Sequence, residues 1–140
     1  MTELILRHPT VADSKAMYDL IDHTPGLDTN SHYQYALWCR DFASRCAVAF
    51  ENDKLVGVLT GYVRPDRPDT YFAWQTAISV NSTNSDIAQE MYDFVARSFS
   101  NDGINRIEMS VDEDNRAVRF LLSRLRRHYD ATITSETLFT

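Results

Sequence analysis

Long apolar runs are missing from this chain of 140 residues. None approaches the ~18 consecutive apolar residues that a membrane-spanning helix requires. The N-terminal stretch MTELILRHPT also lacks the basic, apolar and small-residue segments that together make a signal peptide. We therefore expect a cytoplasmic protein.

Positive charge is scarce as well. The chain has 14 Lys and Arg residues against 20 Asp and Glu residues, a formal net charge of −6. Non-specific binding to nucleic acid depends on neutralising phosphates with basic side chains, so this composition argues against it. Any anionic ligand must therefore bind at a local basic site.

Cysteine and histidine are few and scattered. The two cysteines, Cys39 and Cys46, form no C-x-x-C pair, and Cys46 begins an apolar run, CAVAF, typical of a buried strand. No ligand spacing connects the four histidines, which are His8, His23, His32 and His128. We expect two reduced thiols in or near the core and no metal site.

The apolar and aromatic contents, 44% and 11%, are sufficient for one compact domain over residues 1–140. The chain is organised around Thr70–Val80, TYFAWQTAISV, an aromatic and β-branched run that predicts a central strand. The following residues, Asn81–Phe99, begin as a polar loop and continue with apolar residues at helical spacing from Ile87. A strand, turn and helix of this kind is where α/β folds usually bind phosphates.

The same signals predict the other elements. Further strands are predicted at Glu3–Arg7, Cys46–Phe50, Leu55–Val63, Ile104–Val111 and Ala131–Phe139. Three further helices are predicted. The first starts at a capping box formed by Thr10 and Asp13, and the last covers Asn115–Arg126. The second follows the polar stretch Leu27–Ser31 and has Tyr33, Ala36 and Leu37 facing inward. Arg64–Asp69 contains two prolines and is predicted as a surface loop. The order indicates an α/β fold, a mixed and mostly antiparallel sheet with helices on both faces.

This order is similar to that of the Gcn5-related N-acetyltransferases. Three blocks resemble, more specifically, the L-2,4-diaminobutyrate acetyltransferases of ectoine synthesis. The blocks are Leu27-Asp28-Thr29-Asn30-Ser31 with Tyr33 and the later Cys39-Arg40-Asp41-Phe42; Gly57 through Gly61-Tyr62 with Pro65-Asp66-Arg67-Pro68-Asp69-Thr70 and Phe72-Ala73-Trp74-Gln75; and Glu108 with Asn115 and Thr137-Leu138-Phe139. The resemblance covers nearly the whole chain, and its LDxNSxY and RPDxxFxWQ blocks are specific to that family.

The resemblance implies transfer of the acetyl group of acetyl-CoA to the 4-amino group of L-2,4-diaminobutyrate, by direct attack of the neutral amine. The residues of the blocks suit a substrate with two amines and a carboxylate. Asp28 and Glu108 would hold ammonium groups, and Trp74 would pack on the substrate or make a cation–π contact. The substrate carboxylate or backbone would be bound by Asn30, Ser31 and Gln75.

The predicted catalytic residues are Glu108, Tyr33 and Trp74. An inward-facing Glu108 favours a functional role, because an unpaired buried carboxylate is costly. Proton donors for the leaving thiolate are sought among the tyrosines, and spacing does not choose between Tyr33, Tyr35, Tyr62 and Tyr71.

Structural roles compete with these functional ones. Trp74 on a central strand is equally well explained as a core residue, and Asp28, Asn30 and Ser31 as helix-cap residues. Asn115 is expected to cap the last helix, although in the family this position also lies beside the pantetheine of CoA. The basic cluster on that helix favours a solvated face over contact with CoA phosphates; its members are Arg116, Arg119, Arg124, Arg126 and Arg127.

The resemblance also implies an acetyl-CoA site along the central strand and the following turn. Its predicted residues are Ala77, Ile78, Val80, Asn84, Ser85, Ile87, Ala88 and Asn115. The family turn carries an R/Q-x-x-G-x-G/A motif whose backbone N–H groups grip the pyrophosphate. Here Asn84 and Asp86 replace the glycines and Thr83 the arginine. Asp86 can cap the helix but places a negative charge at the phosphate site, so we expect weaker acetyl-CoA binding than is usual.

The expected partners are the small amine, acetyl-CoA and a second copy of the chain. Family members continue into a seventh strand, whereas this chain stops at Thr140. The predicted strand Ala131–Phe139 would then be an open edge, which favours a homodimer. Two alternatives stay open: a catalytically impaired relative that binds a small amine or a protein partner, and an acetyltransferase for another small amine.

Overall fold

The computed structural model describes residues 3–82, 84–112 and 114–138, and the chain divides into two compact units at Ser110 and Val111. Thr83 and Phe139, which entered the predictions above, lie outside the described residues. The first unit holds every strand described, and the second holds one helix.

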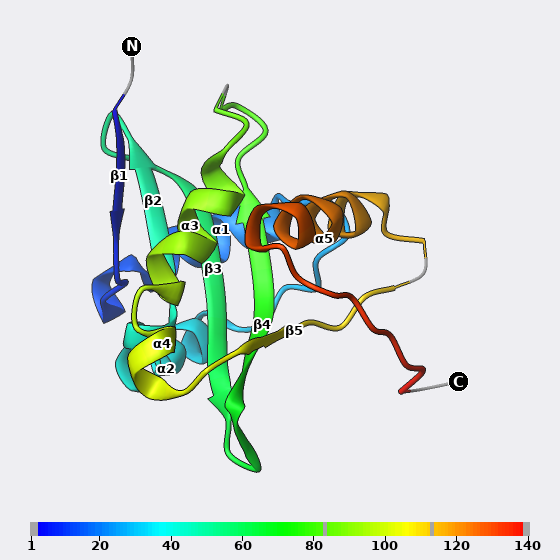
Figure 1. Cartoon of the computed structure of the whole chain (residues 1–140). Coiled ribbons are helices and arrows are strands. Elements are labelled where there is room, and N and C mark those ends of the chain that lie inside the picture. Colours follow the sequence, from blue (N-terminus) through cyan, green and yellow to red (C-terminus); the bar gives the residue numbers. More distant parts are fainter. Residues whose placement is uncertain (1–2, 83, 113, 139–140) are drawn as a thin grey trace. The chain divides into compact units, whose positions relative to one another are not determined.

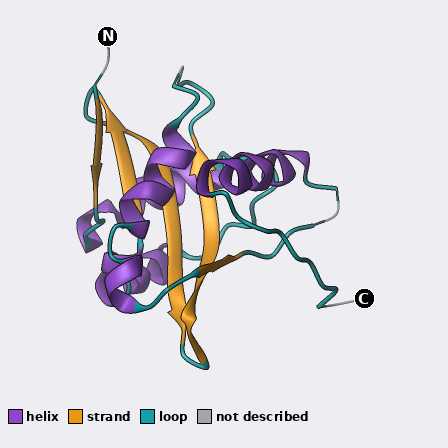
Figure 2. Cartoon of the chain, viewed as in Figure 1, coloured by secondary structure: helices purple, strands orange, loops and turns teal. Residues whose placement is uncertain are grey.

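One sheet organises the first unit, with its strands in the order β1-β2-β3-β4-β5. The strands are β1 (Leu4–Arg7), β2 (Ala47–Glu51), β3 (Lys54–Arg64), β4 (Arg67–Ile78) and β5 (Arg106–Glu108). Neighbours from β1 to β4 are antiparallel, and β4 and β5 are parallel. Figure 1 shows β4 between β3 and β5, and Figure 2 marks the same strands in orange. The predicted mixed, mostly antiparallel sheet is confirmed.

Helices cover both faces of this sheet. The register partners Val48, Val58 and Ala77 share a buried core with residues of α1 (Ser14–Asp22) and α2 (His32–Asp41). On the other face α3 (Ile87–Ala96) packs so closely on Gly57 that a Cβ there would come 2.7 Å from Ile87 Cγ2. This packing therefore requires glycine at residue 57. In Figure 1, α3 crosses in front of the sheet and α1 lies behind it.

The first two helices begin as the sequence predicts. Thr10 and Asp13 form the expected capping box, with the Thr10 N–H donating to Asp13 Oδ2 at 2.7 Å. The box starts a short 3-10 turn, η1 (Val11–Asp13), that leads into α1. Ser31 Oγ accepts from the Gln34 N–H at 3.1 Å and caps α2. Two further short segments are η2 (Ala43–Arg45) and α4 (Phe99–Asp102).

The hairpin between β3 and β4 contradicts the surface loop predicted over Arg64–Asp69. β3 extends to Arg64 and β4 starts at Arg67, so the turn between them has only two residues. Pro68 lies inside β4, at a shift in the register where it has no partner on β3. A proline there removes no ladder hydrogen bond, and the sheet therefore tolerates it.

The buried face of α2 also differs from the prediction. Tyr35 and Cys39, one turn apart, are buried, whereas Tyr33 is 72% exposed. Successive helical residues are about 100° apart, so Tyr33 and Tyr35 point to nearly opposite sides of the helix. The inward position assigned to Tyr33 was wrong by this rotation.

Both cysteines are buried and free of disulfides, as expected. Burial raises the pKa of the Cys39 thiol to about 11 and that of Cys46 to about 12. Both thiols are therefore protonated at neutral pH and poor nucleophiles.

The second unit consists of α5 (Arg116–Tyr129) and the residues around it. Asn115 Oδ1 accepts from the Val118 N–H at 3.1 Å, so the predicted N-cap is confirmed. The strand predicted over Ala131–Phe139 is wrong for its described part, because residues 131–138 are exposed and in no ladder. A strand that buries no face and has no neighbour is not stable alone. No helix in the described ranges, α5 included, is long and apolar enough to cross a membrane.

Candidate active site

β4 and β5 separate partway along the sheet. β5 pairs only with Thr70–Phe72 of β4, the last pair being Phe72 and Glu108. β4 continues to Ile78, and no strand of the described residues pairs with this edge beyond Phe72 (Figure 1). The place where the strands separate, just after Phe72 and Glu108, is termed the fork. β5 is shorter than the predicted strand Ile104–Val111, and its early end leaves backbone N–H and C=O groups of β4 for an extended ligand.

A β-bulge lies on β4 next to the fork. Thr60 and Gly61 are consecutive on β3, yet they pair with Gln75 and Ala73, so Trp74 is the extra residue. The bulge directs two consecutive side chains to the α2 face. The Tyr35 ring stacks on Trp74 with centroids 5.8 Å apart, and the Tyr35 hydroxyl donates to Gln75 Oε1 at 2.9 Å.

Gln75 connects this bulge to the segment before α2. Its side chain is 6% exposed, and Nε2 donates to the Asp28 carbonyl oxygen at 2.8 Å. The Asn30 N–H donates to the Tyr35 hydroxyl at 3.3 Å, which in turn donates to Gln75. The Gln75 N–H donates to Thr60 Oγ1 at 3.2 Å. Buried amides are costly unless hydrogen-bonded, so these partners fix where Gln75 and the segment lie.

An aromatic cluster surrounds the bulge on the same face. The Trp38 ring stacks on Trp74 at 4.4 Å, and its Nε1 donates to the Gly61 carbonyl oxygen at 3.2 Å. The ring centroid of Tyr62 lies 5.9 Å from that of Trp38 and 5.5 Å from that of Phe72. The aromatic cluster is defined as Tyr35, Trp38, Tyr62, Phe72 and Trp74. Its faces offer apolar contact and a site for a cation.

Glu108 ends β5 at the fork. Its two carboxylate oxygens accept from Arg64 Nη1 at 3.3 and 3.2 Å, and the side chains are 39% and 29% exposed. The sequence argument for a functional Glu108 applied only to an inward, unpaired carboxylate, and here Glu108 is partly exposed and pairs with Arg64 across the sheet. Glu108 is the register partner of Phe72, so its side chain emerges on the same face as the aromatic cluster.

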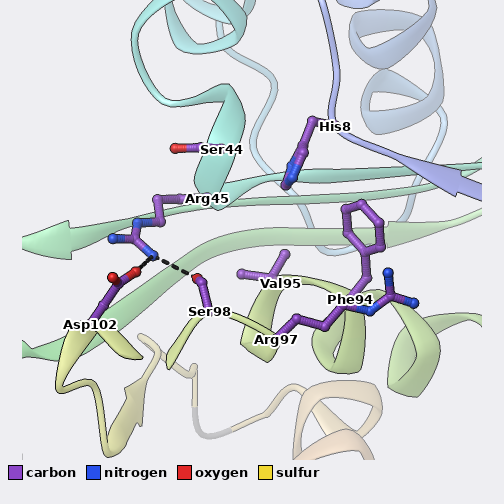
Figure 3. Close-up of a pocket in the computed structure, with 8 residues that line it drawn as sticks. All are labelled: His8, Ser44, Arg45, Phe94, Val95, Arg97, Ser98 and Asp102. Carbon is purple, nitrogen blue, oxygen red and sulfur yellow. Dashed lines mark hydrogen bonds and ion pairs between the residues drawn. The ribbon is translucent and has the colours of Figure 1, made fainter. Parts of the chain in front are cut away.

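Two hollows lie outside this region. One cavity has a volume of about 310 Å³. Among the residues that line it, Arg45 donates to Ser98 Oγ and to Asp102 Oδ2 (Figure 3). A second hollow, of about 490 Å³, borders the residues after β4 and includes Ser79 and Asn81. None of the predicted amine-site residues lines either hollow. Within the ranges described, no three His, Cys, Asp or Glu residues are grouped to hold a metal ion.

The acetyltransferase (GNAT) family model matches residues 14–125. The chain belongs to this family. It is 36% identical to an L-2,4-diaminobutyric acid acetyltransferase of Streptomyces coelicolor, over 98% of this chain and 82% of that protein. It is 33% identical to the protein of the same name from Halomonas elongata, over 97% of this chain and 71% of that protein.

Solved GNAT structures agree with this assignment. One is the diaminobutyrate acetyltransferase EctA from Paenibacillus lautus, solved in complex with L-2,4-diaminobutyric acid and coenzyme A. It is 29% identical to this chain, the TM-score is 0.87, and the match covers 93% of this chain and 78% of that one. Ard1 from Thermoplasma volcanium, 14% identical over 94% of this chain and 84% of that one, has a TM-score of 0.76 and shares the fold. The resemblance inferred from the sequence blocks is confirmed.

In this GNAT chain the structure brings most of the predicted amine-site residues together. Gln75 bonds directly to the backbone of Asp28, and through the Tyr35 hydroxyl it is connected to the backbone of Asn30. Three predicted residues are not part of this group. Ser31 caps α2, Tyr33 is exposed on the far side of α2, and Glu108 pairs with Arg64. Sequence reasoning missed Trp38, Thr60, Arg64 and the structural role of Tyr35. Spacing three residues apart on α2 was the available signal for Tyr35 and Trp38.

The predicted cofactor residues divide into core and surface. As whole residues Ala77 and Ile87 are 1% and 0% exposed, so both lie in the core, whereas Val80 is 83% exposed. Asn84 Oδ1 accepts from the Asp86 N–H at 2.8 Å. Asp86 is the N-cap residue of α3 but its side chain makes no cap hydrogen bond. Asn115 belongs to the second unit.

Proposed function

We propose that this GNAT chain transfers the acetyl group of acetyl-CoA to the 4-amino group of L-2,4-diaminobutyrate, a reaction of ectoine synthesis. The observation that carries the proposal is the fork. It places an open strand edge, an aromatic cluster and the Glu108 carboxylate around one point of the sheet. The named relatives, at 33% and 36% identity over most of the chain, support the same substrate.

The α2 face of the fork suits the amine. Trp74 and Trp38 stack on one another, and the ring surface that this contact leaves uncovered would favour a cationic or partly apolar substrate chain. Glu108 supplies a carboxylate for an ammonium group. Gln75 and Tyr35 hold the segment from Asp28 to Asn30 at one wall of this region. These contacts orient the amine, which is the main task of an enzyme that works by direct attack.

The β4 edge and the start of α3 suit the second substrate. Acetyl-CoA supplies the thioester whose acetyl carbon the amine attacks, with loss of an amine proton and departure of the CoA thiol. Backbone groups of β4 beyond Phe72 suit the extended pantetheine, and the first N–H groups of α3 suit phosphate. The negative charge of Asp86, the N-cap residue of α3, opposes that role.

An acetyl-transfer assay tests the proposal. Purified protein is mixed with acetyl-CoA and L-2,4-diaminobutyrate, thiol release is followed, and the product is identified by NMR. We expect acetylation at the 4-amino group. Acetylation of a different small amine alone would favour the alternative substrate class. If calorimetry detects no acetyl-CoA binding, either by this chain or after the motif glycines are restored, the hypothesis of an amine-binding relative would replace that of an enzyme.

The domain count, the assembly and the location predicted from the sequence remain proposals. The family match from residue 14 to residue 125 spans both compact units, which supports a single acetyltransferase domain over residues 1–140. The homodimer was predicted from an edge strand that residues 131–138 do not form, so a dimer would need another surface. Light scattering at micromolar concentration tests it, and cell fractionation tests the cytoplasmic location.

A further inference from the structure

We propose that Arg64 and Glu108 form the receptor for the α-amino-acid end of the substrate, with Arg64 binding the α-carboxylate and Glu108 the α-ammonium group. This inference rests on the proposed function and names the residues that select an amino acid over a simple diamine. Arg64 was absent from the site predicted by sequence.

The two residues lie in the right place for this role. Arg64 ends β3 and Glu108 ends β5, on either side of β4. Phe72 of β4 lies between them as the register partner of Glu108, and it contacts Tyr62, two residues before Arg64. The ion pair therefore borders the aromatic cluster at the fork. A substrate held there by its α-carbon would extend its side chain along the aromatic faces.

Arg64 is held firmly on one side and loosely on the other. Asp66 accepts from Arg64 Nη2 at 2.8 Å and from Nε at 3.2 Å. The bonds from Nη1 to Glu108 are 3.2 and 3.3 Å, longer than the ~2.7–2.9 Å usual for charge-assisted pairs. Only the Nη2 bond to Asp66 is short, so the longer Nη1 contact with Glu108 is the one that we expect a ligand to replace.

Charge and donor counts agree with this exchange. A guanidinium has five N–H donors in a planar arrangement, and Asp66 and Glu108 do not use all of them. A carboxylate can accept from two of these donors side by side. An incoming zwitterion gives Arg64 a new carboxylate and Glu108 a new cation, so neither charge is left unpaired. Exposures of 29% and 39% leave the pair accessible from solvent.

Removing the guanidinium tests the assignment. Arg64→Gln and wild type are compared on L-2,4-diaminobutyrate and on 1,3-diaminopropane, the same diamine without a carboxylate. We expect kcat/KM for diaminobutyrate to fall about tenfold or more, mainly through KM, because a hydrogen bond to a charged group is lost. Activity on diaminopropane should change little. Arg64→Lys keeps the charge without the planar fork and should fall between the two.

Arg67→Gln is the matched control. Arg67 lies on the same hairpin, where its Nε is 3.9 Å from Asp69 Oδ1, and its loss should leave both substrates unaffected. Thermal melting checks that each variant is folded. Unchanged activity of Arg64→Gln on diaminobutyrate, or an equal loss of activity on both substrates, would overturn the assignment of Arg64 to the receptor.

Failure of the proposed function is distinguishable from failure of this inference. If wild type acetylates neither substrate, the proposed function falls. The receptor is then judged by calorimetric binding of L-2,4-diaminobutyrate, in which Arg64→Gln must lose tenfold relative to wild type. No binding by wild type, or equal binding by both proteins, would overturn the receptor.

Discussion

The two sides of the fork are made from different parts of the chain. On the amine side, aromatic rings and the Gln75 amide from α2 and β4 contact one another directly. On the side proposed for acetyl-CoA, the contributors are the open backbone edge of β4 and the first turn of α3, whose side chains Ala77 and Ile87 belong to the core. We therefore expect one substrate to be recognised by side chains and the other mainly by backbone.

This difference predicts where substitutions are tolerated. A site made from side chains changes whenever one of its residues changes. A site made from backbone changes only if the new side chain blocks the approach, alters the charge or shifts the register. The nonglycine residues Asn84 and Asp86 should therefore weaken acetyl-CoA binding without abolishing it, whereas changes at Gln75 or Trp74 should be severe.

The largest effect is expected from Gln75→Leu. The change removes two side-chain hydrogen bonds and leaves the buried Tyr35 hydroxyl without its acceptor, at a cost of about 2–3 kcal/mol in the free energy of unfolding. Urea denaturation measures this loss, and the KM for diaminobutyrate should rise with it. Tyr35→Phe removes one end of the same bond and should cost less, with non-additive losses in the double variant. Wild-type stability in Gln75→Leu would show that the network stabilises nothing.

The next effect is expected from Trp74→Ala, which should lower kcat/KM for diaminobutyrate by tenfold or more, in line with the ~1.4 kcal/mol of one good cation–π or polar contact. Affinity for acetyl-CoA, measured by calorimetry, should stay close to wild type, because that site relies on backbone. Trp74→Phe keeps an aromatic face and serves as the control. An equal loss of affinity for both substrates would break the proposed division between side chains and backbone.

A smaller effect is expected from restoring the family turn with Thr83→Arg, Asn84→Gly and Asp86→Gly. Removal of the charge at the α3 N-terminus should tighten acetyl-CoA binding about two- to fivefold, since a charge near a helix end contributes roughly 0.3–1 kcal/mol. The KM for diaminobutyrate should not move. If the parent chain already binds acetyl-CoA as tightly as the restored variant, the inference about the turn is wrong.

The smallest effect concerns the common scaffold. Arg7 donates to Asp13 at 2.7 Å and lowers the pKa of the Asp13 carboxyl. Because the folded pKa is the lower one, this pair stabilises the protein above the unfolded pKa and the contribution is lost as pH falls through the folded value. The expected loss is under about 1 kcal/mol, because Arg7 is 44% exposed. Unfolding of wild type and Asp13→Asn between neutral and acid pH checks it: the difference in stability should shrink as the solution becomes acidic.

Much of the fold and part of the site could be predicted from sequence. Periodicity located the strands from Glu3 to Val80 and the helices, because an apolar face must be buried wherever it occurs. The WQ pair and the LDxNSxY block marked Trp74, Gln75, Asp28 and Asn30, which the structure connects through the contacts of Gln75 and Tyr35. The family itself was carried by these blocks. Local turn chemistry likewise marked the caps at Ser31 and Asn115.

The tertiary structure decided the rest, because it depends on register and on helix rotation. A single extra residue in β4 directs both Trp74 and Gln75 to one face, and no local pattern announces that bulge. A rotation of 100° per residue exchanges Tyr33 for Tyr35 in the site. The end of β5 at Glu108 both opens the fork and brings Arg64 to that carboxylate across β4. Sequence alone thus determined the family and the residue chemistry, whereas strand pairing determined which of those residues meet.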